Sequence, residues 1–168
     1  MKGTRIIVSS PPRGVFEDVI VVGTPKPGTV MEIVPAVEPV GGVFRYAVYG
    51  TQAASGGLYV SADGDRKCIA VLLEKDDEGQ TYNDAYVTLQ RGRIYFPIAG
   101  EQLNMLFANL SGTDSTAIGD EFMVDDGTGK LIDADNDAEA HPFTCLETGT
   151  AMSADEWRWC RFNGEGGA

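Results

Sequence analysis

Apolar residues along this chain fall into short runs that are separated by glycine, proline, asparagine and aspartate. Many of the runs are rich in Val, Ile, Tyr and Phe, which favour strands, whereas the residues between them favour turns. The pattern therefore predicts an all-β protein. The strands that we expect are residues 17–22, 29–34, 43–49, 57–61, 68–74, 84–89, 93–98, 121–125, 130–133, 142–147 and 156–162.

Three segments refine this picture. Residues 68–74 are apolar on both faces, so this strand is expected to cross the core. Pro97 interrupts the run 93–98 and indicates an edge strand or a bulge. In residues 101–110 the apolar positions have the spacing of a helical stripe, but they also alternate as in a strand. We favour a strand there.

The predicted fold is a small β-barrel or β-sandwich of short strands with an extended N-terminal arm and little helix. No repeat with a period of about 20–50 residues is present, which argues against propellers and solenoids. The expected parts are an extended arm (1–16), a single β-rich domain (17–163) and a flexible tail (164–168).

The arm differs in composition from the rest of the chain. It carries three of the thirteen Lys and Arg residues, no acidic residue, and a Pro11-Pro12 pair that cannot lie inside a helix. We expect its apolar stretch, residues 6–8, to form a strand that adds to a sheet edge of a partner. A frayed terminus is the alternative interpretation.

Charge and hydropathy restrict the partners. The formal net charge is −12 at pH 7 and the pI is near 4.3. A nucleic-acid partner is not expected, because phosphate binding requires a basic surface. The N-terminal residues lack the apolar stretch of a signal peptide, and no apolar span of about 18 residues exists. We therefore expect no membrane partner and a location in the cytoplasm.

The three cysteines, Cys68, Cys145 and Cys160, are widely spaced and odd in number, so they cannot all pair within one chain. No Cys-x-x-Cys motif is present for zinc or redox chemistry. Cys68 lies in an apolar run, where a buried thiol is expected. The cysteine pattern fits a protein of a reducing compartment.

Residues 124–141 contain the most suggestive chemistry. A phosphate loop needs glycine five positions before the Gly129-Lys130 glycine, and Ser or Thr after the lysine, but Val124 and Leu131 occupy these places. The backbone cradle and the magnesium-binding hydroxyl are therefore both missing. The segment is better explained as the turn of a hairpin between 121–125 and 130–133.

Calcium is a weak candidate in the same region. Asp133, Asp135 and Asp137 fit positions 1, 3 and 5 of an EF-hand loop. Position 6 is Ala138 instead of glycine, and position 12 is Thr144 instead of glutamate. An acidic solvated loop explains the aspartates better, and we predict no cofactor.

No catalytic residue is expected either. His141 is the only histidine, and nothing around it builds a nucleophile elbow or an oxyanion turn. The acidic residues lie in polar turns rather than in the apolar cleft that raises a catalytic pKa. Trp157 and Trp159 alternate and so share one face of a strand. They are candidates for interface anchors or a carbohydrate platform, and core packing is the favoured alternative.

A series of short motifs follows one another along the chain, namely Pro27-Gly28-Thr29, Ala70-Val71-Leu72, Tyr82-Asn83 with Ala85-Tyr86, Gly119-Asp120 and Gly129-Lys130-Leu131. This series resembles the head decoration (cement) proteins of tailed bacteriophages. The order of the motifs along residues 17–135 carries the resemblance, because no single motif carries chemistry.

The resemblance implies a non-enzymatic structural protein that trimerises. Such a protein binds the outside of the assembled head at three-fold or quasi-three-fold positions and clamps neighbouring subunits of the major capsid protein. It would assemble in the host cytoplasm and remain on the virion surface. In this chain the capsid-binding arm would comprise Arg5, Ile6, Ile7, Val8 and Arg13. The alternative function is a carbohydrate- or receptor-binding β module of a phage tail or head fibre, using Trp157 and Trp159.

Overall fold

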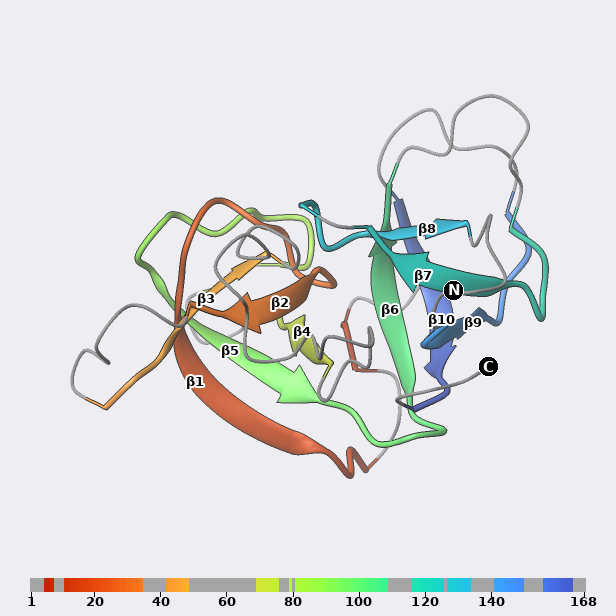
Figure 1. Cartoon of the computed structure of the whole chain (residues 1–168), viewed down its shortest axis with the longest axis horizontal. Helices are drawn as coiled ribbons and strands as arrows, with labels where there is room; N and C mark the ends of the chain where they lie inside the picture. The colour runs from red at the N-terminus through yellow and green to blue at the C-terminus, as the bar shows by residue number, and fades with distance from the viewer. Residues whose placement is uncertain are drawn as a thin grey trace, which may run out of the picture.

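The architecture is all-β, as expected, and the strands form two closed five-stranded barrels (Figure 1). A computed structural model describes ten strands and no helix in the ranges that follow. The described residues are 5–7, 11–34, 42–48, 69–75, 79, 81–108, 116–125, 127–133, 141–149 and 156–164.

Barrel 1 is built from the first five strands, in the closed order β1-β3-β2-β4-β5. β1 and β3 are parallel, and every other neighbouring pair in this barrel is antiparallel. The strands are β1 (Val15–Val21), β2 (Val30–Ile33), β3 (Arg45–Val48), β4 (Ala70–Leu72) and β5 (Arg91–Phe96).

Barrel 2 repeats this topology with the next five strands, in the closed order β6-β8-β7-β9-β10. Here β6 and β8 form the parallel pair, and the other four pairs are antiparallel. The strands are β6 (Gln102–Phe107), β7 (Glu121–Val124), β8 (Leu131–Asp133), β9 (Phe143–Cys145) and β10 (Glu156–Phe162).

The correspondence between the barrels extends to individual hydrogen bonds. A positive-φ glycine precedes the second strand of each barrel, Gly28 in one and Gly119 in the other. The Gly28 N–H donates to Leu72 of β4, and the Gly119 N–H donates to Cys145 of β9. The chain is thus a structural duplication. Its sequence shows no repeat, because the matched positions share backbone geometry and not side chains.

Most predicted strands are confirmed within one to three residues at their ends. Residues 101–110, which have ambiguous periodicity, contain strand β6, and the turn at 127–130 joins antiparallel β7 and β8. β5 ends one residue before Pro97, so the proline terminates the strand instead of marking an edge. The predicted strand at 57–61 lies outside the described residues.

The strand predicted for residues 84–89 is wrong. This segment forms turns that lead into β5, and its backbone bonds to Pro25 and Val21 instead of to a full neighbouring strand. Of its apolar residues, Tyr86 is buried and its hydroxyl donates to the Leu73 carbonyl at 2.8 Å, whereas Val87 and Leu89 are exposed. Tertiary contacts of Tyr86 therefore override the local strand propensity of this segment.

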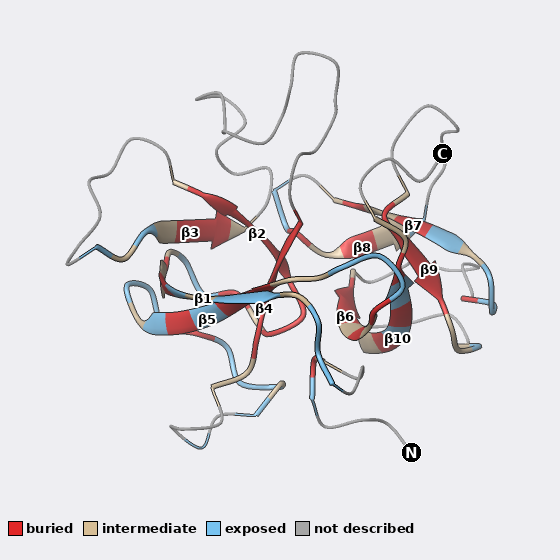
Figure 2. Cartoon of the chain, turned by 90° about the horizontal axis from the view of Figure 1, so that it is seen from below, coloured by how far each residue is buried: buried red, intermediate tan, exposed pale blue. Residues whose placement is uncertain are grey.

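The core explains why residues 68–74 are apolar on both faces. Ala70 and Leu72 of β4 pack inside barrel 1, whereas Ile69, Val71 and Leu73 pack in a second cluster together with the interior of barrel 2. β4 is therefore buried on both sides, as predicted. Figure 2 shows buried residues on the strands of both barrels. The two barrels share one continuous apolar cluster and cannot separate without exposing it.

Candidate functional site

One edge of β6 organises the contact between the two barrels. β6 pairs with its parallel neighbour β8 at one position, Phe107 with Leu131. Further along the same strand, the Leu106 N–H donates to the Gly28 carbonyl at 3.0 Å and the Asn104 N–H donates to the Ile6 carbonyl at 2.7 Å. An open strand edge is a liability unless it is covered. Two segments from early in the chain cover this one.

The Pro27-Gly28-Thr29 turn is the closest contact between the barrels. Gly28 has φ of 85°, and a Cβ placed there would lie 2.9 Å from the Asn104 carbonyl oxygen and 3.0 Å from the Leu106 nitrogen. Only glycine fits such a left-handed position against another backbone. Val30, which follows the turn, donates its N–H to the Gly129 carbonyl at 2.8 Å. The turn is thus inserted between β6 and the start of β8.

Trp157 secures this turn from the barrel 2 side. Its Nε1 donates to the Pro27 carbonyl at 2.8 Å, and its ring meets Tyr82 edge-on at 5.0 Å between centroids. The Lys26 ammonium lies 5.5 Å from the ring centroid, within range of a cation–π contact. Trp159 lies on the same outward face and is 37% exposed. The indole N–H of Trp157 is therefore used inside the chain.

The arm residues are partly folded against the chain itself. Ile6 is fully buried in the shared core, and Ile7 forms an antiparallel bridge with Leu103 of β6. Arg5 is exposed, and the Arg13 guanidinium donates to the Ala99 carbonyl at 3.4 Å. Val8 lies outside the described residues. As folded here, Ile6 and Ile7 already occupy a sheet edge, and binding a partner through them requires their release.

A buried carboxylate holds the start of β1 to the connection between the barrels. Glu101 is fully buried and accepts hydrogen bonds from the Arg13 N–H at 2.6 Å, the Ile98 N–H at 2.8 Å and the Tyr95 hydroxyl at 2.7 Å. The Tyr95 hydroxyl in turn accepts from the Gly14 N–H at 2.7 Å. This network satisfies a charge that would otherwise be costly to bury.

The network also shifts two pKa values. Burial alone would raise the pKa of Glu101, but the hydrogen bonds from Ile98, Arg13 and Tyr95 outweigh burial and lower it. Burial and the hydrogen bond to Glu101 raise the pKa of Tyr95 to about 12. The hydrogen bonds therefore favour the ionised form of the Glu101 carboxyl. The sequence signal for it was weak, namely a single acidic residue at the start of an apolar strand.

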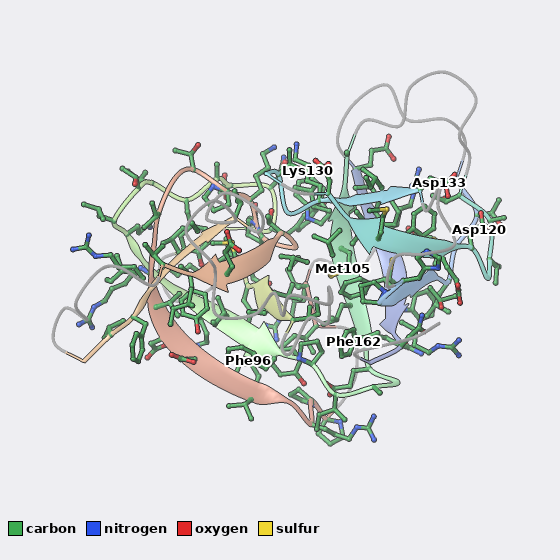
Figure 3. The ribbon with its side chains drawn as sticks, in the orientation of Figure 1. Phe96, Met105, Asp120, Lys130, Asp133 and Phe162 are labelled. Carbon is green, nitrogen blue, oxygen red and sulfur yellow. The ribbon has the colours of Figure 1, made fainter. Side chains whose placement is uncertain are left out.

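The remaining described residues that the sequence suggested for phosphate, calcium or catalytic chemistry lie in turns or at strand ends. Gly127 and Gly129 take positive φ in the β7–β8 turn, as the hairpin interpretation predicts. Asp133 is exposed at the opposite end of β8 from Lys130 (Figure 3), while Asp135 and Asp137 lie outside the described residues. The described residues contain no cluster of three potential metal ligands. The His141 Nδ1 lies 3.2 Å from the Glu121 carboxylate.

Exposed apolar side chains lie near both ends of β1 of barrel 1, and together we call them the β1 surface. Two of its members start the strand, two lie on the turns before β5, one precedes β3 and one follows β5. Elsewhere among the described residues, the large exposed apolar side chains are Ile118 and Trp159 of barrel 2. The β1 surface comprises Val15, Phe16, Phe44, Val87, Leu89 and Ile98.

Leu89 is the most unusual residue of the β1 surface. It is the one described residue other than glycine with positive φ, at 65°, and 58% of it is exposed. Its N–H donates to the Val21 carbonyl, while the Phe44 carbonyl accepts from the neighbouring Ile20. Leu89 and Phe44 thus flank the last residues of β1, at the end of barrel 1 remote from barrel 2 (Figure 1). Backbone strain that presents an apolar side chain to solvent is typical of a contact surface.

The described residues include no helix long and apolar enough to cross a membrane. Neither a protein-family model nor a curated protein sequence matches the chain.

Proposed function

We propose that this chain is a non-enzymatic decoration (cement) protein of a tailed-phage capsid. It binds the outside of the assembled head as a homotrimer, at three-fold or quasi-three-fold positions, and stabilises contacts between major capsid protein subunits. The supporting observations are the ordered motifs of residues 17–135 and the duplicated all-β body. The observation that carries a binding role is the apolar β1 surface with Leu89 at positive φ.

The energetics of capsid stabilisation are compatible with a small apolar contact surface. A protein that binds the assembled shell and not its free subunits shifts the equilibrium toward the shell. Each contact can be small, because three linked copies act together. A few residues supply most of the binding energy in protein–protein interfaces. In this proposal the β1 surface contacts the capsid or the neighbouring copy. The arm adds a capsid contact only after Ile6 and Ile7 leave β6.

The carbohydrate-binding alternative gains no support from the tryptophans. A stacking platform needs two accessible rings with free polar handles. Trp157 is half-buried, donates to Pro27 and packs on Tyr82, so Trp159 is left as the more accessible ring. Trp157 serves the inter-barrel contact instead. Residue Trp159 is still available as an interface side chain.

The first test measures oligomeric mass by sedimentation equilibrium. The proposal expects three times the 18.0 kDa of one chain. The second test is cosedimentation with expanded heads that lack decoration protein, from the phage whose genome encodes this chain. Wild-type protein should pellet with the heads and raise the temperature at which they release DNA. A monomer that neither pellets nor protects the heads would remove the proposal.

A pair of matched variants tests whether the β1 surface makes the contact. Leu89→Asn replaces an exposed leucine by a residue that tolerates positive φ, so the fold should be kept. Ile118→Asn makes a comparable change at the most exposed large apolar residue of barrel 2. Leu89→Asn should weaken head binding at least tenfold, and Ile118→Asn should leave it within twofold. Equal binding by both variants would place the contact elsewhere.

A further inference from the structure

Cys145 and Cys160 face each other across the seam between β9 and β10. They are direct partners in the antiparallel register of these strands. The Leu146 N–H donates to Trp159, and the Asn163 N–H donates to Pro142. Hydrogen-bonded and non-hydrogen-bonded rungs alternate along such a ladder, so the cysteine pair occupies a non-hydrogen-bonded rung.

This rung has the geometry that a disulfide requires. Residues opposite each other at a non-hydrogen-bonded rung have Cα atoms about 4.5 Å apart and side chains on the same face. Disulfides accept Cα separations of about 4.4–6.8 Å. Both thiols are free and fully buried in the shared core. The Cys145 Sγ donates to the Glu147 carbonyl at 3.1 Å, and the Cys160 Sγ to the Arg158 carbonyl at 3.6 Å.

The two thiols also differ in acidity in the way that a reactive pair requires. The hydrogen bond with Cys160 lowers the pKa of Cys145 to about 7, and it outweighs the opposing effect of burial. Burial and the neighbouring Cys145 raise the pKa of Cys160 well above its usual value. Because the thiolate is the nucleophile, Cys145 is the thiol that would react first once local opening of the β9–β10 seam admits the oxidant, and Cys160 lies opposite to resolve the product.

We propose that Cys145 and Cys160 form a reversible redox site, which closes to a cross-strand disulfide when the protein meets a peroxide. The Cys145 thiolate attacks one oxygen of hydrogen peroxide, forming a sulfenic acid and releasing hydroxide, which takes up a proton to become water. The Cys160 sulfur then attacks the Cys145 Sγ and displaces the hydroxyl, which leaves as a second water with the Cys160 proton. Two thiols and one peroxide thus give one disulfide and two waters.

The consequence is a covalent seam in barrel 2. β9 and β10 share three register pairs, of which the cysteine pair is one. β10 also carries Trp157, which holds the Pro27 turn of barrel 1. Fixing β10 to β9 therefore restricts opening of barrel 2 and of the inter-barrel contact together. A disulfide that closes a loop of this size makes unfolding about a hundredfold less favourable.

The experiment uses the full chain with Cys68→Ser as background, so that Cys145 and Cys160 are the two cysteines left to react. The protein is treated with hydrogen peroxide, quenched, denatured and titrated for thiols, and its peptides are mapped without reduction. We expect loss of both remaining thiols, a mass lower by two hydrogens, and one peptide pair joined through Cys145 and Cys160. Dithiothreitol should restore both thiols.

Single variants and stability separate this site from unspecific oxidation. Cys145→Ser and Cys160→Ser, each in the same background, should form no intramolecular disulfide. The melting temperature of the oxidised parent should exceed that of the reduced parent by about 6–12 °C. Two unreacted thiols would overturn the proposal. So would oxidation that adds oxygen to both sulfurs without joining the peptides, or a disulfide that forms only between chains.

Discussion

Replacing Gly28 by alanine tests the central claim that one turn of barrel 1 is inserted into barrel 2. The added Cβ destabilises the folded state in two ways. Alanine at φ of 85° costs about 1–2 kcal/mol in any surroundings. The methyl group would also lie 2.9 Å from the Asn104 oxygen and 3.0 Å from Trp157 Nε1, so the turn must move out.

Moving the turn breaks further contacts. The hydrogen bonds Leu106 N–H to Gly28 and Trp157 Nε1 to Pro27 are lost, at about 0.5–1.5 kcal/mol each. Together with the backbone cost, Gly28→Ala should lower the free energy of unfolding by about 2–5 kcal/mol.

The duplication supplies a matched control. Gly119 occupies the equivalent turn of barrel 2, with φ of 100° and nothing within 4 Å of a Cβ. Gly119→Ala should therefore lower the free energy of unfolding only by the cost of placing alanine at positive φ, about 1–2 kcal/mol. Urea denaturation followed by tryptophan fluorescence and by circular dichroism measures both values. If the two variants lose the same stability, the Gly28 turn is not inserted between the strands, and the inter-barrel contact described here is refuted.

Three further variants test the Glu101 network, the hydrogen bond from Trp157 to Pro27 and the strained backbone of Leu89. Glu101→Gln should cost about 2–4 kcal/mol in urea denaturation, because an amide cannot accept from every donor that faces the carboxylate; a loss below 1 kcal/mol would contradict the network. The pKa of Glu101 in the folded protein is lower than its ordinary value of 4.5. The carboxylate therefore contributes its full stabilisation above pH 4.5, and this stabilisation is lost as the pH falls through the pKa of the folded state. In an acid titration monitored by circular dichroism, the wild type should lose more stability than Glu101→Gln. Trp157→Phe keeps a ring but loses the bond to Pro27, and should cost about 1–2 kcal/mol by the same denaturation assay; no change would mean that the indole N–H is not used. Leu89→Gly removes the positive-φ strain and should leave stability unchanged or raise it by up to about 1 kcal/mol; a clear loss would show that the leucine packs within the chain.

The strand pattern could be read from the sequence because it depends on local chemistry. Short runs of β-branched and aromatic residues between turn residues predict strands whatever their partners are. The same local pattern failed at residues 84–89, where a buried Tyr86 hydroxyl bond and the positive φ of Leu89 arise from tertiary contacts.

The pairing of strands and side chains was not predictable in the same way. The odd number of cysteines excluded complete pairing, but only the β9–β10 register places Cys145 opposite Cys160. The role of Glu101 depends on donors from Arg13 and Tyr95, which no sequence spacing connects. The Pro-Gly-Thr motif stood out in the sequence, yet its meaning required a second barrel that the sequence pattern does not repeat.

The insertion of the Gly28 turn has a consequence for how the protein is made on the ribosome. Pro27 is synthesised early, but its partner Trp157 follows 130 residues later. At about 5–20 residues per second, this interval is on the order of 10 s. Ile6 waits in the same way for β6. Barrel 1 must therefore emerge with an unfilled apolar face, and its final structure is completed only when the C-terminal strand leaves the ribosome.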